Sequence, residues 1–420
     1  MMLKANRTDQ DHASRTKHIL ILVENLPVPF DRRVWQEATS LVQAGYEVSV
    51  ICPRTRGFTQ RYELLEGVHI YRHFLPLEAS GIAGFFLEYA SALVGELRLA
   101  LKASRRRRID AIQACNPPDL LFLVAAPFKL FGVRFVFDHH DTFPELFQVK
   151  FPRLKLLYRA TRLAEWLTFR MADRVITTSD GLRRMTAARN GKSLAEITLV
   201  RSGPDLQRLR HPAANPALRE GFAHVALYIG IIGQQDGLDL LMRAVAHLVY
   251  QLRRTDTLFI VVGDGPQKSA IEALASTLNI APYLRFTGYL SGPPLFERLA
   301  SADIGVCCDP KNAFNDKLSM NKVMEYMSFG LPVVQFDLTE NRLLAGDASM
   351  YAGDDNDPHA LAEAIDALLD DPQRRQRMGH LGRQRIESEL AWCHQVAAYL
   401  RVYRELLGGP ESNAGSAILT

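Results

Sequence analysis

Asn315–Glu340 reads NDKLSMNKVMEYMSFGLPVVQFDLTE, and this stretch predicts a helix followed by a buried strand. We expect the helix to span Ser319–Phe329, with Ser319 as its N-cap. Apolar residues recur along one side of that helix, at Val323, Met324 and Met327. Gly330 supplies a left-handed stop, and the short apolar segment Leu331–Val334 is typical of a buried strand.

Charged residues stand out around this helix. Lys317 and Lys322 lie near its start, where free N–H groups and the positive end of the helix dipole already attract an anion. Glu325, one turn further on, is charged in an otherwise apolar neighbourhood, as a residue that grips a sugar hydroxyl would be. An ordinary amphipathic helix with solvated ends explains the same pattern, so the helix alone leaves both interpretations open.

The ending EYM-x2-G-x-PVV resembles the donor-binding helix of the retaining GT-B glycosyltransferases of family 4. In that family two carboxylates, separated by seven residues, hold the donor sugar and the nucleotide ribose. Glu325 matches the second of them, which binds the ribose. Lys317 stands at the position of the first, so the resemblance leaves Asp316, one residue away, as the candidate catalytic-site carboxylate.

The resemblance extends from about Lys17 to Leu407 and implies an α/β chain with the GT-B fold, in which two Rossmann-like, doubly wound domains face each other across a cleft. A length of 420 residues suits two such domains. We expect a disordered lead-in (1–16), an acceptor-binding domain (17–205), a donor-binding domain (206–390), a helix that crosses back to the first domain (391–407) and a tail (408–420).

A proline-rich loop follows the first predicted strand, Lys17–Asn25, and Asp31 is expected to cap the next helix. Such a loop lies at the carboxyl edge of the sheet, where doubly wound folds bind ligands. Family members often carry a Gly–Gly pair there, which approaches the donor phosphates. Here the loop reads NLPVPFDRR, so Arg32 and Arg33 are candidates for the acceptor or phosphate side. Arginines that are merely solvated at a helix start are the alternative.

A polar cluster, Asp138–Asp141, follows the strand predicted at Val133–Phe137. Its adjacent histidines have no further spaced ligands, which is weak evidence for a metal site, and we expect neither a metal nor another cofactor. Structural loop histidines are the alternative to catalytic ones. The resemblance implies a site histidine that faces the donor sugar after this strand. His140 is the best match, with Asp141 as a second catalytic candidate and Glu145 as a further residue that could orient the histidine.

The loop Gly230–Gly237 opens the second predicted domain. Many family members carry an arginine just after its first glycine and a lysine before its last, and both clamp the donor diphosphate. Here those positions hold Ile231 and Asp236, so Lys317, Lys322 and the helix start are expected to supply the positive charge. The resemblance adds donor-side candidates in two later turns: Gly263, Gly265, Gly288, Tyr289 and Leu290.

Charge is unevenly distributed along the chain. Residues 1–210 carry 32 basic against 21 acidic side chains, and residues 211–420 carry 18 against 25. A basic half predicts an anionic partner. Two predicted helices, Gly81–Ala103 with the four arginines near its end and Phe151–Met171, mix apolar with basic residues, which favours an anionic membrane surface or a phosphate-bearing lipid. Packed helices with solvated basic ends are the alternative. The chain has no zinc-finger spacing and no aromatic RNA-binding motif, so no nucleic-acid partner is expected.

Cysteine usage and the first residues indicate a compartment. The five scattered cysteines show no CxxC spacing and predict buried thiols in a reducing environment. Residues 1–16 are polar and lack the apolar run of a signal peptide. We therefore expect a cytoplasmic protein, peripheral on the inner face of the membrane.

The resemblance implies metal-independent, hexosyl-type glycosyl transfer with retention from a nucleotide-sugar. The basic first half of the chain suggests a lipid-linked or polysaccharide-precursor acceptor, in cell-surface or exopolysaccharide synthesis. Two alternatives stay open. An epimerase of the same fold would need buried acid and base carboxylates in the cleft. A non-catalytic nucleotide-sugar-binding or scaffold protein is favoured by the loss of the usual carboxylate and both usual cations. The directions in which Lys317 and Lys322 point separate this last alternative from an enzyme.

Overall fold

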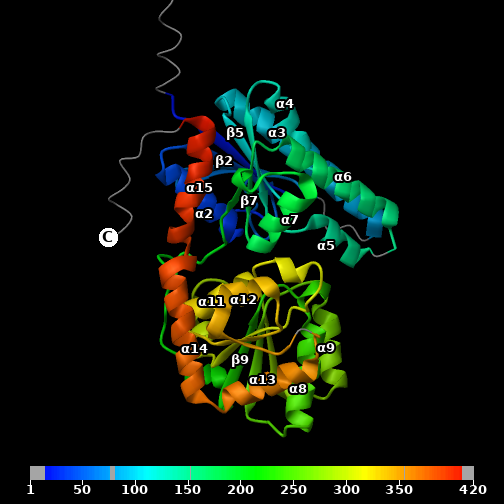
Figure 1. The fold of residues 1–420 in the computed structure, drawn as a ribbon, viewed down its shortest axis with the longest axis vertical. Coiled ribbons are helices and arrows are strands. Elements are labelled where there is room, and N and C mark those ends of the chain that lie inside the picture. The colour runs from blue at the N-terminus through cyan, green and yellow to red at the C-terminus, as the bar shows by residue number, and fades with distance from the viewer. Residues whose placement is uncertain (1–14, 76–80, 152, 354, 409–420) are drawn as a thin grey trace, which may run out of the picture. The chain divides into compact units, whose positions relative to one another are not determined.

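The computed structural model describes residues 15–75, 81–151, 153–353 and 355–408. The chain divides into two compact units, coloured from blue to red along the sequence in Figure 1. Unit 1 comprises Met1–Thr178, Leu182–Val200 and Val396–Thr420, and unit 2 comprises Ser179–Gly181 and Arg201–Gln395. Most of the predicted lead-in (1–16) and nearly all of the predicted tail (408–420) lie outside the described residues.

Eight described strands of unit 1 form one sheet in the order β3-β4-β2-β1-β5-β6-β7-β8. Their bounds are β1 His18–Val23, β2 Glu47–Pro53, β3 Tyr62–Leu65, β4 Val68–His73, β5 Ala111–Cys115, β6 Arg134–His139, β7 Arg174–Thr177 and β8 Ile197–Leu199. Neighbouring strands are parallel, except that β3 pairs antiparallel with β4. The strand order reverses between β1 and β5, which makes that edge the topological switch point where such sheets bind ligands.

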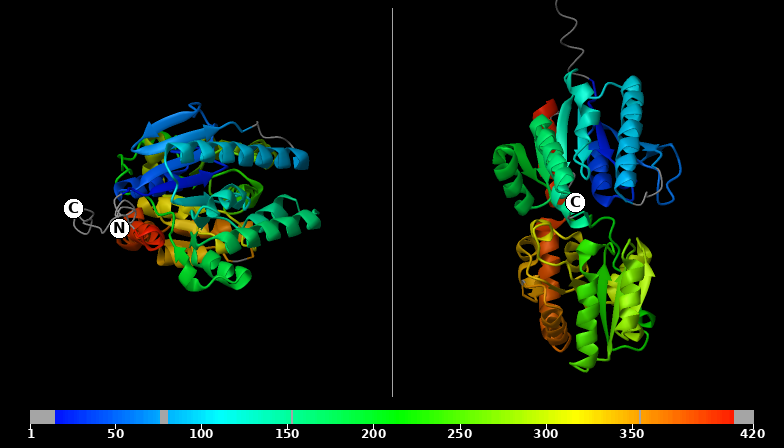
Figure 2. Two further views of the ribbon diagram at one scale, coloured as in Figure 1. Left: turned by 90° about the horizontal axis from the view of Figure 1, so that it is seen from above. Right: turned by 90° about the vertical axis from the view of Figure 1, so that its right-hand side faces the viewer.

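Helices flank the sheet of unit 1 on both faces (Figures 1 and 2). The helices are α2 Arg32–Gln43, α3 Gly81–Arg106, α4 Phe122–Lys129, α5 Phe143–Lys150, α6 Lys155–Met171, α7 Asp180–Asn190 and α15 Trp392–Leu407. Because both faces are covered, β1 (HILILV) is apolar at every position after His18 and buried throughout. Asp31 caps α2 as predicted, since its carboxylate accepts a hydrogen bond from the Val34 N–H at 3.1 Å.

Two predicted helix bounds in unit 1 differ from those observed. The helix predicted over Gly81–Ala103 continues to Arg106, so Arg105 and Arg106 form its last turn. The helix predicted over Phe151–Met171 begins at Lys155. None of the described helices is long and apolar enough to cross a membrane.

In unit 2 the described residues form a six-stranded parallel sheet in the order β11-β10-β9-β12-β13-β14. Its strands are β9 His224–Ile229, β10 Thr257–Val262, β11 Leu284–Gly288, β12 Ile304–Cys307, β13 Val333–Gln335 and β14 Ser349–Tyr351. Its helices are α8 Leu238–Tyr250, α9 Lys268–Thr277, α10 Pro293–Ser301, α11 Asn321–Ser328, α12 Thr339–Ala345, α13 Pro358–Leu369 and α14 Pro372–Arg385. The switch point of this sheet lies between β9 and β12.

The expected start of the helix in Asn315–Glu340 is wrong by two residues. Helix α11 begins at Asn321, and Ser319 does not cap it. A short 3₁₀ turn, Asn315–Lys317, precedes it, and the Asn341 side chain accepts the Met320 N–H at 3.2 Å. Asn341 thus holds the backbone just before the helix, and no described side chain caps α11.

The thiols follow the prediction with one exception. All five cysteines are free, and four are buried, but Cys393 is exposed in the first turn of α15. The scattered spacing of the cysteines could not predict that Cys393 lies exposed on the surface of a helix.

Candidate functional site

The strands β9 and β12 separate at their carboxyl ends, and Tyr326 of α11 fills the opening. These strands pair at only two positions, near their amino ends. Beyond them the Tyr326 hydroxyl accepts a hydrogen bond from the Ile229 N–H at 2.8 Å and donates one to the Val306 carbonyl at 3.1 Å. The ring lies on β12, where a Cβ at Gly305 would come within 2.3 Å of it. The tyrosine of the EYM sequence thus fastens α11 to the switch point.

Lys322 lies at the same edge, within a cluster of charged and aromatic side chains. Its ammonium donates to Asp309 Oδ2 at 2.7 Å and lies 3.8 Å from Asp236 Oδ1. It also lies 3.4 Å from the Tyr228 hydroxyl and 4.7 Å from the centre of that ring. Burial alone would lower the pKa of Lys322, but Asp309 and the other neighbours raise it well above its usual value. The lysine is therefore a charged group at the switch point.

The position of Lys322 bears directly on the missing diphosphate clamps. A Cβ at Gly230 would lie 3.3 Å from the Lys322 Nζ, so the ammonium lies against the loop that follows β9. Asp236, which holds the position of a family lysine, faces this ammonium from the same loop. The loop lacks a cation of its own, and α11 brings one to it.

Lys317 and Asp316 lie in the 3₁₀ turn before α11 and have other partners. The Lys317 ammonium is exposed and donates to the Ala313 carbonyl at 3.0 Å. Both Asp316 carboxylate oxygens accept hydrogen bonds from Thr339, one from its N–H at 2.7 Å and one from its hydroxyl at 3.0 Å. Asp316 therefore holds the start of α12, and of the two predicted lysines only Lys322 is placed in the cluster at the switch point.

The remaining donor-side candidates lie around the same sheet edge. Gly263 follows β10 at φ +153°, and a Cβ there would be 1.8 Å from the Gly230 carbonyl oxygen, so only a glycine fits. Glu325 is partly exposed in the second turn of α11. The others lie near the ends of β10 and β11. Gly265 lies in the turn after β10, Gly288 is the last residue of β11, and half-exposed Tyr289 and partly buried Leu290 follow it directly.

At the switch point of unit 1, Arg33 is bound to buried acids. Its guanidinium donates to both oxygens of Asp138, at 2.8 and 3.2 Å, and lies 3.1 Å from Glu37 Oε1. It also donates to the Val200 carbonyl at 2.9 Å, and its side chain is only 7% exposed. Arg33 was predicted to lie on the acceptor or phosphate side, but its guanidinium is bound to the protein's own groups. The adjacent Arg32 is exposed.

The charges of this network follow from its burial. Burial alone would raise the pKa of Asp138, but Arg33 and His140 hold it well below its usual range. Burial raises the pKa of Glu37 well above its usual value. The Arg33 cation and the Asp138 anion thus lie beside a carboxyl group, that of Glu37, whose protonated form is favoured by burial.

His140 is the part of this network nearest the surface. Its ring Nε2 lies 2.6 Å from Asp138 Oδ2, and its side chain is 18% exposed. Its backbone N–H donates to Asn116 Oδ1 at 2.6 Å. The Asp141 N–H reaches the same Asn116 oxygen at 3.3 Å. Glu145, expected to orient His140, instead pairs with Arg189.

His139 differs completely from its neighbour. It is fully buried, stacked on Phe137 with ring centres 5.5 Å apart and set edge-on to Phe169 at 5.1 Å. Burial, with the nearby His140, lowers the pKa of His139 to about 3. It is a neutral core residue, as the structural alternative for a loop histidine predicted.

Solved structures share this architecture. Sucrose-phosphate synthase from Thermosynechococcus elongatus matches with a TM-score of 0.77 at 18% identity, over 93% of this chain and 99% of that one. The Anabaena protein HepE, solved in complex with UDP-glucose, matches with a TM-score of 0.68 at 16% identity, over 93% and 99%. At these identities the likeness shows the fold, which is GT-B.

Two family models match the sequence in the same order as the two units. Glycosyltransferase Family 4 matches residues 31–208, and Glycosyl transferases group 1 matches residues 223–371. The chain belongs to the GT-B glycosyltransferases. Glycogen synthase from Mycobacterium tuberculosis is 29% identical over 242 residues, which are 57% of this chain and 55% of that protein. The match thus spans about half the length of that relative.

Cys115, Asp138 and His140 of this glycosyltransferase bring three potential metal ligands together. The Arg33 guanidinium, however, already lies on both Asp138 oxygens. Burial also raises the pKa of the Cys115 thiol well above its usual value. A cation here would meet a fixed positive charge and a protonated thiol, so these residues do not fit a metal ion.

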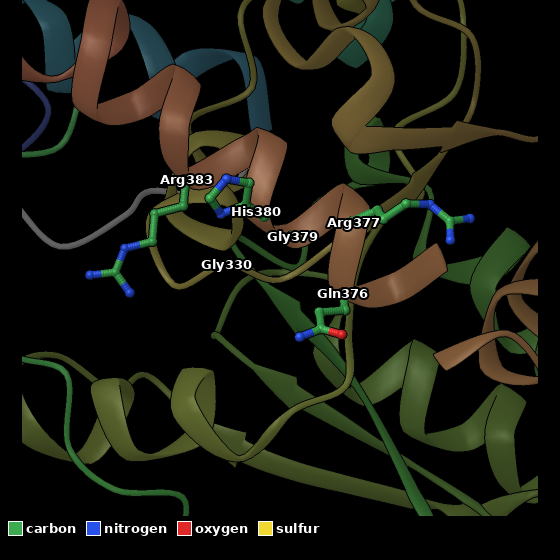
Figure 3. A pocket seen from close by; sticks show the side chains of 6 residues that line it. All are labelled: Gly330, Gln376, Arg377, Gly379, His380 and Arg383. Atoms are coloured by element: carbon green, nitrogen blue, oxygen red, sulfur yellow. The ribbon is translucent and has the colours of Figure 1, made fainter. Parts of the chain in front are cut away.

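A pocket of about 460 Å³ lies on the surface of α14. It is lined by Gly330, Gln376, Arg377, Gly379, His380 and Arg383. Figure 3 shows the side chains of Arg377 and Arg383 pointing in opposite directions. Since its cations diverge, this pocket does not form a cage for a diphosphate, and the donor-side candidates lie elsewhere in the glycosyltransferase.

Proposed function

We propose that this glycosyltransferase transfers a sugar from a nucleotide-sugar, with retention, to a lipid-linked or polysaccharide-precursor acceptor. The observation that carries the donor half of the proposal is the Lys322 ammonium at the switch point of unit 2, against the loop after β9. A charged donor group at the carboxyl edge of a parallel sheet suits a diphosphate. The UDP-glucose complex of HepE supports the same class of donor.

The proposed roles follow from the positions of the side chains. Lys322 and the turn at Gly263 contact the diphosphate, and Glu325 holds the ribose. The bond between the anomeric carbon and the diphosphate oxygen breaks, the acceptor oxygen bonds to that carbon on the same face, and the acceptor proton leaves with the diphosphate. Charge on the leaving group is stabilised by Lys322 without a metal. His140 and Asp141 serve the donor sugar, and Asp316 supports α12 beside it.

Thermal unfolding with UDP-, GDP-, ADP- and dTDP-sugars tests the donor site, because a ligand of the folded state raises the melting temperature. We expect one nucleotide class to stabilise the wild-type chain and to lose its effect in Glu325→Ala and Lys322→Met. Lys317→Met is the matched control, since its exposed ammonium contacts only a neighbouring carbonyl among the described residues. A panel without any stabilising nucleotide would refute the proposal.

A non-catalytic nucleotide-sugar-binding protein is the second candidate function. It is favoured by the short Lys322–Asp309 contact, which neutralises the cation that would stabilise a leaving diphosphate. Mass spectrometry of the stabilising donor, incubated with the chain and with extracted lipid or saccharide acceptors, distinguishes the two. Release of free nucleoside diphosphate with a glycosylated product identifies the enzyme, whereas binding without turnover identifies the alternative.

The acceptor half of the proposal rests on the outer surfaces of α3 and α6. These helices pack their inner sides into one apolar cluster of unit 1, and α4 contacts both. On α3 the exposed apolar residues are spaced by seven: Leu87, Val94 and Leu101. On α6 they are Leu156, Leu163 and Trp166, with Arg159 and Arg170 exposed among them. Glu165, the only acidic residue of α6, is buried. Exposed apolar and basic side chains, with Glu96 of α3 and Glu165 of α6 buried, suit an anionic lipid surface on the inner face of a membrane.

Vesicle flotation tests this surface. We expect the chain to bind vesicles that contain an anionic phospholipid, and to bind purely zwitterionic vesicles weakly. Leu163→Ser with Trp166→Ser should abolish flotation, whereas the matched change Leu381→Ser, an exposed leucine on α14, should not. Equal flotation of both variants would refute the lipid surface and leave the donor proposal intact.

A further inference from the structure

We propose that Asp138 is a positioning residue for the transfer reaction, and that it directs the Nδ1 atom of His140 to the substrate. The inference rests on the proposed function, in which His140 acts at the donor sugar. It extends that function to a buried carboxylate and to the C-terminal helix, neither of which contacts substrate.

The hydrogen-bond geometry fixes which histidine nitrogen is occupied. Asp138 Oδ2 lies 2.6 Å from His140 Nε2, and the Arg33 Nε lies 3.0 Å from the same nitrogen. An ionised carboxylate only accepts hydrogen bonds, so the close contact requires a proton on Nε2. The Arg33 Nε–H has its own acceptor in the same Asp138 oxygen, at 3.2 Å. With this proton held on Nε2 by Asp138, the neutral form of the ring offers the Nδ1 lone pair, which suits a sugar hydroxyl.

Gln113 holds the carboxylates from the opposite side. Its amide N–H groups donate to Glu37 Oε2 at 2.7 Å and to Asp138 Oδ2 at 3.3 Å. Its carbonyl oxygen accepts from the hydroxyl of Tyr399 at 2.8 Å and from that of Tyr403. Two hydroxyl donors on one side and two carboxyl acceptors on the other leave a single orientation for this amide.

The last turns of α15 thus complete the support of His140. Tyr399 and Tyr403 are fully buried and belong to unit 1. The connection runs from their hydroxyls through Gln113 to Asp138, and from Asp138 to the histidine ring. The two hydroxyls, both ends of the Gln113 amide and the Asp138 carboxylate each have a partner in this chain of contacts, which favours one rigid arrangement over several.

The first test measures the His140 ring directly, without any activity. Long-range proton–nitrogen spectra of histidine-labelled protein report which ring nitrogen carries the proton, and His140→Ala assigns the signal. We expect the Nε2–H form in the wild-type chain. In Asp138→Asn the amide oxygen turns to Arg33 and its NH₂ faces the ring, so the pattern should change to Nδ1–H. An unchanged pattern would overturn the proposal.

The second test is a double-mutant cycle, measured with the donor that stabilises the chain. We expect Asp138→Asn to lower kcat by at least tenfold with a donor KM within about threefold, and to have no further effect in a His140→Ala background. The matched control is Asp173→Asn, a carboxylate of the same unit that binds Lys129 and the Phe135 N–H. An equal loss of kcat in both backgrounds would show a merely structural role.

If Asp138→Asn fails to fold, the pair Tyr399→Phe with Tyr403→Phe keeps the proposal testable, because it removes the two hydroxyls and leaves all charges in place. It should broaden or shift the His140 nitrogen signals and lower kcat more than it changes KM. Unaltered signals and kcat would overturn the role of α15. If the wild-type chain turns over no donor, the proposed function fails, and the spectra still decide the position of the proton.

Discussion

Two acids surround a buried cation at each switch point of this chain, and the two arrangements differ in how the cation is fastened. Arg33 in unit 1 has Asp138, Glu37 and the Val200 carbonyl within 3.2 Å. Lys322 in unit 2 has one such contact, to Asp309, and its other two polar neighbours lie at 3.4 and 3.8 Å.

The chemistry of the two cations explains this difference. A guanidinium is a planar fork that is held in one orientation by several acceptors, whereas an ammonium is a point charge on a flexible stem. Arg33 is thus suited to fix neighbouring side chains, and Lys322 keeps the freedom to turn from Asp309 toward a ligand. A cation between two acids thus serves support in unit 1 and, in the proposed function, binding in unit 2.

The largest effect should come from removing the fastened cation. Arg33→Met leaves Asp138 buried without its main counter-charge, which costs about 3–5 kcal/mol of unfolding free energy. Arg32→Met, one residue earlier and exposed, should change it by less than about 0.5 kcal/mol. Urea unfolding of the two variants measures the difference. Similar midpoints would show that Arg33 is not the support described here.

Removing the looser cation should affect ligand binding more than folding. Lys322→Met is expected to weaken binding of the stabilising nucleotide-sugar ten- to hundredfold, about 1.4–2.8 kcal/mol, because a charge-assisted contact to the diphosphate is lost. Isothermal titration calorimetry provides the affinity. Lys317→Met removes an exposed ammonium, and an equal loss of affinity in this variant would contradict the role given to Lys322.

The histidine beside the unit 1 network should make stability depend on pH. The pKa of His139 is lowered to about 3 in the folded chain, so between about 3 and 6.5 the unfolded state binds a proton that the folded state does not. Stability should therefore fall as the pH falls below 6.5, by about 1.4 kcal/mol per unit, or roughly 2 kcal/mol at pH 5. Urea unfolding between pH 5 and 7.5 should give a flatter profile for His139→Phe than for the wild type, and parallel profiles would contradict the assignment.

The smallest effect is expected at Tyr326. Tyr326→Phe keeps the ring but leaves the Ile229 N–H and the Val306 carbonyl without the hydroxyl between them, which costs about 1–2 kcal/mol. Half-exposed Tyr289→Phe is the control and should be neutral. Thermal unfolding resolves a change of this size. A neutral Tyr326→Phe would show that the strand ends are satisfied in another way.

The sequence predicted most of the fold because its signals are local. The apolar run of β1, the Asp31 cap and the glycine stop after α2 each lie within a few residues of the element that they define. Strand β3 was missed because it is a short edge strand with a half-exposed pattern and little hydrophobic signal.

The candidate site was harder to predict, because its partners are distant in sequence. Arg33 and Asp138 are separated by 105 residues, and no single-chain pattern joins them. One local signal was available: Arg33 and Glu37 are four residues apart, and Glu37 lies among the apolar positions of α2, which indicates a buried pair.

The roles of Asp138, Asp309 and Tyr228 were not predicted, because an acid or a tyrosine near the carboxyl end of a strand has many uses. Lys322 was expected near the diphosphate because it lies at the start of the helix and because Ile231 and Asp236 replace the usual cations. That expectation stays a prediction, and the contacts with Asp309 and Asp236 add a competitor for its charge.

The contact between Tyr326 and Gly305 also bears on how this sequence can change over generations. Any side chain at position 305 would overlap the tyrosine ring, since even a Cβ would come within 2.3 Å of it. Position 305 therefore cannot drift while Tyr326 is kept. A descendant that acquires alanine at 305 must first, or at the same time, accept a smaller residue at 326, and so give up the hydroxyl that holds the two strand ends together.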